Sequence, residues 1–364
     1  MKEKPTMLHY IHQEQQILTQ ILDQYPTNIE PSLVTLPKNE QLLILGTGSS
    51  INAALSAKYY IERHAQIQIA IEEPYNYLNY ANYLAENQLV LAISQSGQST
   101  ATIDALNRLS SSNQKIAVTS IPDSEICHAA DSILDILSGR ELVGYVTLGF
   151  SATVLNLMLF GLRLGVKKGL VSPSQEQAEL LEFRKIVSSI NKTIAKTVDF
   201  FEVNEKELVA AHRFMSIGYG PAFGSIKEME TKFSETIRVP SQGIDLEAFM
   251  HGPYLEMKPD YRLFFLDTPA KANVREKAAL LKNYEEKVTP HTFLISVVKE
   301  RADSRKELIL HSISDEEKAP LLLIIPFQVL CWYISKAKGI DITQRIFTDF
   351  SQAVKSKTTV QQYV

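Results

Sequence analysis

Residues 41–50 read QLLILGTGSS, an apolar run that ends in a glycine turn and two serines. A short apolar run bounded by glycine is typical of a buried β-strand, whereas residues 49–62 repeat their apolar side chains at helical spacing. Strand, turn and helix in this order form the repeating unit of a parallel sheet, because parallel strands need a helical crossover. The later runs IQIAI, LVLAI and KIAVTS predict further strands of the same sheet.

The same pattern occurs a second time. Residues 213–220 read RFMSIGYG and lead into another helical pattern. The junctions that follow correspond as well, because Ser94 lies 46 residues after Gly48 and Leu266 lies 46 residues after Gly220. A duplication that keeps one register predicts two domains of the same kind. We therefore expect an α/β fold of two doubly wound, three-layer α/β/α domains with mostly parallel sheets.

The domain order follows from the two patterns. A helical pattern at residues 9–24 precedes the first strand, and the polar segment 168–182 separates the two halves. We expect an N-terminal helix within residues 1–30 and a first domain at 31–170. A linker helix should follow at 171–195, and a second domain that includes the C-terminal tail at 196–364.

Composition argues against several partners. The 364-residue chain has a formal net charge of −4 and no basic stripe, so it offers no electrostatic basis for binding nucleic acid. Its longest apolar run, residues 151–165, is shorter than the roughly 20 residues of a membrane span and predicts a buried helix. The first residues lack the apolar stretch of a signal peptide, and we expect a cytoplasmic protein that binds no membrane. Cys127 and Cys331 are isolated, which argues against a disulfide or a metal site.

Two polar loops follow predicted strands, GTGSS at 46–50 and SQSGQST at 94–100. In open parallel sheets, ligands bind beyond the carboxyl ends of the strands, where helix N-termini offer unpaired N–H groups that suit a phosphate. Neither loop contains lysine or arginine or has the pattern of a nucleotide loop, so we expect a single phosphate on a small molecule and no cofactor. The alternative is that the serines only cap the helices. The expected contacts are Ser49, Ser50, Ser94, Gln95, Ser96 and Ser99.

The second half has kept the pattern and changed the loops. GYGPA replaces GTGSS at residues 218–222, and FLDTPAK replaces the serine-rich loop at residues 265–271. The prolines and alanines remove hydrogen-bond donors, so we expect one phosphate pocket per chain, in the first half.

A glycine turn with a serine pair, followed by SQSG in a twice-wound chain, resembles the sugar isomerase (SIS) domain family. The likeness is greatest to the tandem isomerase half of glucosamine-6-phosphate synthase and to the fructosamine-6-phosphate deglycases. The segments ETKFSE and FMHGP and a lysine near the C-terminus support it, and the spacing of 16 residues between Glu235 and His251 matches the family pattern.

The resemblance implies roles for particular residues. Glu235 would move a proton between C1 and C2 of the sugar, and His251 would open the ring, contributed across the interface of a homodimer or higher oligomer. Lys232 and Glu228 would lie on the same helix face as Glu235, at helical spacings. The C-terminal lysine of the family would be Lys357, with Lys355 as the alternative.

Two departures from the family affect these expectations. The stretch 139–151 has Val146, Thr147 and Leu148 where the family usually reads STK, so Thr147 is expected to replace part of the sugar contacts. The glutaminase of the synthase has no counterpart, so glutamine is not expected to supply nitrogen.

Three functions stay open at this level. The favoured one is a phosphosugar isomerase or lyase acting on an amino-sugar or fructosamine phosphate, because such chemistry needs a carboxylate base and a positioned acid. A fructosamine-6-phosphate deglycase would use the same residues. The third possibility is a protein without catalytic activity, either a phosphosugar-binding sensor or a scaffolding oligomer. In that case Glu235 would be a solvated carboxylate on a helix, and His251 would be a histidine in a turn.

Overall fold

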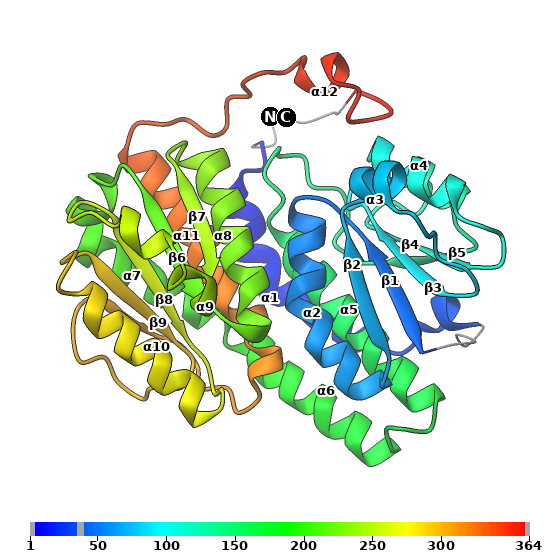
Figure 1. Cartoon of the computed structure of the whole chain (residues 1–364), viewed down its shortest axis with the longest axis horizontal. Coiled ribbons are helices and arrows are strands. Elements are labelled where there is room, and N and C mark those ends of the chain that lie inside the picture. Colours follow the sequence, from blue (N-terminus) through cyan, green and yellow to red (C-terminus); the bar gives the residue numbers. More distant parts are fainter. Residues whose placement is uncertain (1–3, 35–39, 361–364) are drawn as a thin grey trace. The chain divides into compact units, whose positions relative to one another are not determined.

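The two apolar repeats form the centres of two parallel sheets in a computed structural model, which describes residues 4–34 and 40–360 (Figure 1). Each sheet has five strands, and the order in the second repeats that in the first, β2-β1-β3-β4-β5 and β7-β6-β8-β9-β10. Every strand pairing within the two sheets is parallel. The predicted duplication and the α/β/α class are therefore confirmed.

The first unit is built round five short strands: β1 (Gln41–Leu45), β2 (Gln68–Glu72), β3 (Leu89–Ile93), β4 (Gln114–Thr119) and β5 (Ser132–Asp135). Its helices are α2 (Ser49–Ala65), α3 (Pro74–Tyr80), α4 (Thr100–Arg108), α5 (Leu148–Lys167) and the start of α6 (Pro173–Ser188), with short 3-10 turns η1 (Glu30–Leu33) and η2 (Glu125–Ala129). Helices α3 and α4 pack on one face of this sheet, where Leu43 and Val90 join Tyr77 in the core.

Helices α2 and α5 pack closely against each other in this unit. Gly165 permits the approach, because a Cβ there would lie 2.3 Å from the carbonyl oxygen of His64. The apolar run that was expected to be short extends to a helix of 20 residues, and 89% of an 18-residue window of it is buried. A second helix, Glu316–Ala337, is also long and apolar enough to cross a membrane and is buried to the same extent. Such burial is typical of the core helices of α/β domains.

The second unit contains β6 (Phe214–Gly218), β7 (Ser241–Asp245), β8 (Arg262–Asp267), β9 (Thr292–Ser296) and β10 (Glu307–Ile309). Its helices are α7 (Ile190–Val209), α8 (Phe223–Thr236), α9 (Leu246–Phe249), α10 (Ala272–Glu285) and α11 (Pro320–Ala337), with 3-10 turns η3 (Gly220–Ala222), η4 (Pro253–Glu256) and η5 (Glu316–Lys318). On one face the core is aromatic, since Phe233 of α8 and Phe327 of α11 contact Phe264 of β8 edge to face. Each fully buried phenylalanine contributes about 1.5–3 kcal/mol.

The ends of the chain divide differently from the expected boundaries. Helix α1 (Met7–Gln24) gives its first residues, up to Gln15, to the second unit and the rest to the first. The tail from Gln344 on, with the short helix α12 (Phe350–Ala353), groups with the first unit, whereas it was expected in the second domain. The hydrogen bonds that hold the tail there join residues about 260 positions apart.

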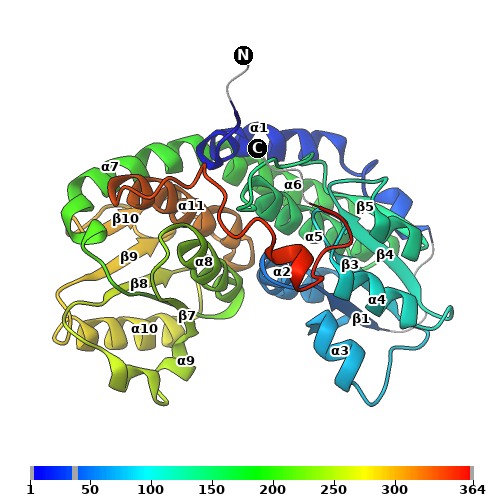
Figure 2. The ribbon, with the colours of Figure 1, turned by 90° about the horizontal axis from the view of Figure 1, so that it is seen from above.

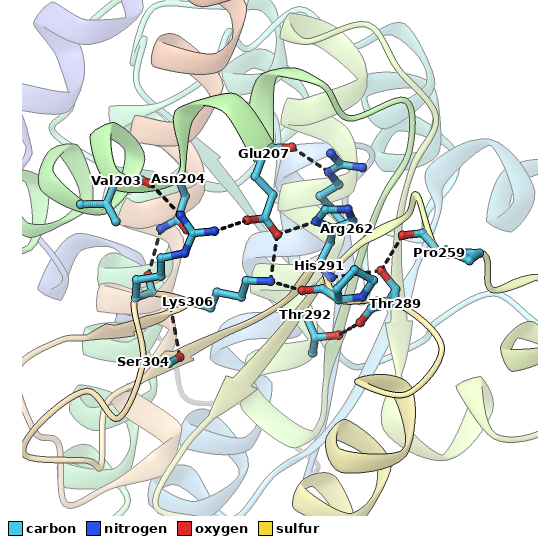
Figure 3. Close-up of polar contacts among 12 residues, drawn as sticks. Val203, Asn204, Glu207, Pro259, Arg262, Thr289, His291, Thr292, Ser304 and Lys306 are labelled. Carbon is cyan, nitrogen blue, oxygen red and sulfur yellow. Dashed lines mark hydrogen bonds and ion pairs between the residues drawn. The ribbon is translucent and has the colours of Figure 1, made fainter.

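A half-buried carboxylate, Glu207, connects α7 to the amino ends of three strands of the second sheet (Figure 3). Glu207 accepts hydrogen bonds or ion pairs from His291 at 2.5 Å, Lys306 at 3.0 Å and Arg305 at 3.3 Å. Its backbone oxygen accepts a hydrogen bond from Arg262 Nε at 2.7 Å. Burial opposes ionisation of Glu207, but the hydrogen bonds from His291 and Lys306 outweigh it and lower its pKa.

Candidate active site

A pocket of about 130 Å³ opens in the first unit at the carboxyl ends of β1 and β3. Strand order runs from β1 to β2 on one side and to β3 on the other, so the pocket lies at the topological switch point, where doubly wound sheets bind their ligands. All six side chains predicted from the two serine loops line it: Ser49, Ser50, Ser94, Gln95, Ser96 and Ser99.

The loop after β3 is held in one conformation by hydrogen bonds. Gly97 has φ +67°, and a Cβ there would lie 1.8 Å from Ser124 Oγ, so only glycine fits. The backbone oxygen of Gln95 accepts hydrogen bonds from the Ser120 amide at 3.1 Å and the Ser120 hydroxyl at 2.7 Å. Ser94 Oγ accepts from the Ser99 amide at 3.3 Å. The loop is therefore organised before a ligand binds.

The serine loops do not behave as simple helix caps. The N-cap residue of α2 is Gly48, which has no side chain, and that of α4 is Ser99, whose side chain forms no capping hydrogen bond. Both helices start at the pocket with the positive ends of their dipoles. This geometry favours an anion as the missing partner over the capping alternative.

The C-terminal tail, drawn in red in Figure 2, groups with the first unit. Lys357 of this tail lines the pocket. Its Nζ donates to Ser96 Oγ at 3.2 Å, and its backbone forms an antiparallel bridge with Ser99. The amide of Thr358 donates to the Gln98 oxygen at 3.1 Å. Burial lowers the pKa of Lys357, and a phosphate beside it would favour its charged form. The alternative, Lys355, is exposed and does not line the pocket.

The expectation that Thr147 contacts the sugar is not supported by its position. Its side chain is fully buried and donates to the Tyr145 oxygen at 2.8 Å, while Val146 and Gly149 line the pocket instead. The cause is Glu141, a buried carboxylate that accepts hydrogen bonds from the amides of Thr147, at 3.0 Å, and Gly149.

Glu141 was not singled out in the sequence. It satisfies the amides at the start of α5, beside the pocket, through bonds that span six and eight residues of irregular chain. An acidic residue shortly before a long apolar helix is the signal that could have identified it, because carboxylates are favoured at helix N-termini.

Three of the predicted site side chains meet in the second unit, on α8: Lys232 and Glu235, predicted as catalytic, and Glu228, predicted as a substrate contact. Lys232 is 1% exposed, and its Nζ lies 2.5 Å from Glu235 Oε2 and 3.6 Å from Glu228 Oε1. Burial alone would lower the pKa of Lys232, but the charges of Glu235 and Glu228 outweigh it and raise the pKa. Glu228 is buried, whereas the side chain of Glu235 is 37% exposed. Lys232 thus joins a buried carboxylate, Glu228, to one that reaches the surface, Glu235.

His251 does not join this cluster within the second unit. Its side chain is 73% exposed, on the turn after α9, and its Nε2 lies 3.3 Å from Glu247 Oε1. The Glu247 carboxylate also pairs with Lys277, and the hydrogen bonds from Lys277 and His251 lower its pKa. The ring of His251 is therefore oriented by the Glu247 carboxylate and remains accessible to solvent.

The second sheet carries no copy of the serine loops at its own switch point. Asp267, at the end of β8, instead pairs with Arg275 at 3.0 Å and accepts a hydrogen bond from Ser296 Oγ at 2.8 Å. An internal ion pair therefore fills the position that corresponds to Gln95. Among residues 4–34 and 40–360, no three His, Cys, Asp or Glu side chains gather in a way that could hold a metal ion.

Comparison with known proteins finds a family model that matches the first unit. The SIS domain model matches residues 35–163. The isomerizing glutamine–fructose-6-phosphate aminotransferase of Nostoc sp. is 25% identical over 365 residues, which cover 94% of this chain and 58% of that protein. The chain thus spans less than two thirds of this curated relative.

Two solved structures share the fold. A candidate phosphosugar isomerase from Clostridium difficile has a TM-score of 0.86 and 24% identity, covering 97% of this chain and 99% of its own. Glucosamine-6-phosphate deaminase from Thermotoga maritima has a TM-score of 0.75 and 22% identity, covering 92% and 96%. The first unit is therefore similar to SIS domains over residues 35–163, and the two units have the three-layer α/β/α fold seen in these solved structures.

Proposed function

We propose that the chain is a phosphosugar isomerase or lyase that acts on an amino-sugar or fructosamine phosphate. The observation that carries this proposal is the pocket of the first unit. It combines two uncapped helix N-termini with five serines and one lysine at the switch point of a parallel sheet. A phosphate dianion would accept hydrogen bonds from the hydroxyls and amides and would neutralise Lys357.

The proposed proton transfer uses Glu235 as the base. Moving a proton between C1 and C2 of an open-chain sugar requires a carboxylate that is ionised yet reachable by solvent and substrate. The ion pair with Lys232 and the partial exposure of Glu235 support that role. His251 is proposed to protonate and open the ring, and its exposure is compatible with contribution to a partner copy in a homodimer.

Proton NMR in deuterated water tests the activity directly. The protein is incubated with fructose 6-phosphate or with a fructosamine 6-phosphate, and the C1 protons are followed for exchange. We expect exchange in the wild-type protein, none in Glu235→Gln, and unchanged exchange in Glu276→Gln, an exposed glutamate of α10 that serves as the charge-matched control. Exchange that survives in Glu235→Gln would contradict the assignment of the base.

The same experiment separates two versions of the activity. An isomerase only moves protons, whereas a deglycase also releases free amine from C1. The Thermotoga relative in fold is named a deaminase, which makes amine release a reasonable second outcome. Phosphosugar binding without exchange in the wild-type protein would overturn the enzymatic proposal in favour of a sensor. The dimer and the cytoplasmic location stay predictions of the sequence.

A further inference from the structure

A second cavity, of about 260 Å³, lies on the second unit at the carboxyl ends of β9 and β10. Its walls come from the first two turns of α7 and from the segments that follow the two strands. The lining residues that bear charge or titrate are Lys192, Lys196, Lys299, Glu300 and His311. This place is the ligand-binding edge of the sheet, although the serine loops of the first unit have no counterpart here.

The lysines of this pocket differ in how their charge is neutralised. Lys299 pairs with Asp303 and Glu307, each at 2.7 Å. Lys192 and Lys196 lie one helical turn apart on α7, and among the ion pairs of the described residues neither has a carboxylate partner within 4.0 Å. Two neighbouring positive charges without a carboxylate ion-pair partner thus face one cavity, whose lining also includes the carboxylate of Glu300.

Lys196 is held in place for such a role. Its Nζ donates to the carbonyl oxygen of Ile309, the last residue of β10, at 2.6 Å. Burial, and then the positive charge of Lys192, lower the pKa of Lys196. An anion bound between the ammonium groups of Lys192 and Lys196 would reduce the electrostatic repulsion between them.

The charge of the cavity selects among anions. A phosphate monoester carries about −1.5 to −2 charges near neutral pH, which balances two lysines, whereas a carboxylate carries only one. We propose that this pocket is a second anion site of the chain, which binds the phosphate group of a small metabolite through Lys192 and Lys196. The site is independent of the first-unit pocket and of the proposed sugar chemistry.

Calorimetric titration with inorganic phosphate at low ionic strength tests this site. The titration uses a Ser94→Ala/Ser96→Ala background, in which the first-unit pocket is weakened. We expect the added pair Lys192→Gln/Lys196→Gln to weaken phosphate binding at least about tenfold, a loss easily resolved by titration. Lys206→Gln, an exposed lysine farther along α7, should leave the affinity unchanged.

Two further results keep the test decisive if the double variant folds poorly. Lys192→Gln alone alters an exposed residue and should still weaken phosphate binding several-fold. Lys206→Gln should leave the salt dependence of phosphate binding unchanged. Acetate, which carries one charge, should not displace phosphate at equal concentration. Equal phosphate affinity in Lys192→Gln and Lys206→Gln, or full displacement by acetate, would overturn the proposal.

Discussion

Replacing Lys232 with methionine should strongly destabilise the second unit. The ammonium group is 1% exposed and lies between the buried carboxylate of Glu228 and the partly exposed carboxylate of Glu235. Methionine fills a similar volume, so the main effect is the loss of a positive charge beside a buried negative one. Breaking one partner of a buried ion pair costs about 3–5 kcal/mol.

For a unit of this size, each kcal/mol lowers the unfolding midpoint by about 2–4 °C, so Lys232→Met should lower it by roughly 6–20 °C. Lys227→Met on the same helix is the control, because its ion pair with Glu230 is about one-third exposed on both sides and is worth at most about 1 kcal/mol. Calorimetry and urea unfolding followed by circular dichroism measure both variants.

A second substitution identifies the cause of the loss. Glu228→Gln removes the buried negative charge, so Glu228→Gln/Lys232→Met should regain most of the stability that Lys232→Met loses. The reasoning would be refuted if Lys232→Met cost no more than Lys227→Met, or if the double variant were as unstable as the single one.

Three other substitutions follow from the same structure. Gly97→Ala should lower phosphosugar affinity by at least about tenfold, because the left-handed turn and the contact with Ser124 exclude a Cβ, and titration calorimetry would measure it. Glu207→Gln should destabilise by about 2–4 kcal/mol at pH 7. Because the pKa of Glu207 is lowered from an ordinary 4.5, this difference should shrink as the pH falls below that value, in thermal melts across pH. Burial raises the pKa of Glu285, so the folded state favours its protonated form, and ionisation destabilises the protein as the pH rises above 4.5. Glu285→Gln should therefore raise the melting temperature at pH 7 by roughly 2–4 °C. The control Glu276→Gln should leave the melting temperature unchanged.

Local patterns were sufficient to predict four strands of the first sheet, β1 to β4, but not the edge strand β5. The run LVLAI became β3 without change, and the glycine turns after β1 and β6 fell where the repeat placed them. Serines that directly follow buried strands had to meet at one sheet edge, because parallel strands bring their carboxyl ends together. The lining of the first-unit pocket by the predicted serines is the result of that rule.

Features that depend on distant or irregular chain could not be predicted in this way. The tail segment that carries Lys357 pairs with the loop at Ser99, and no local pattern signals a pairing between residues so far apart. The burial of Thr147 could not be predicted because its surroundings are set by Glu141 across an irregular loop rather than by helical or strand periodicity.

The most direct test of the central proposal is an NMR titration of the protein with fructose 6-phosphate, in which the backbone amides of residues 94–100 are followed. If the first-unit pocket binds the phosphate, these amides will shift with saturation, and the Ser94→Ala/Ser96→Ala variant will need at least about tenfold more ligand for the same shift. Amides in this loop that stay unmoved while the ligand binds elsewhere, or equal affinity in the variant, would contradict the account.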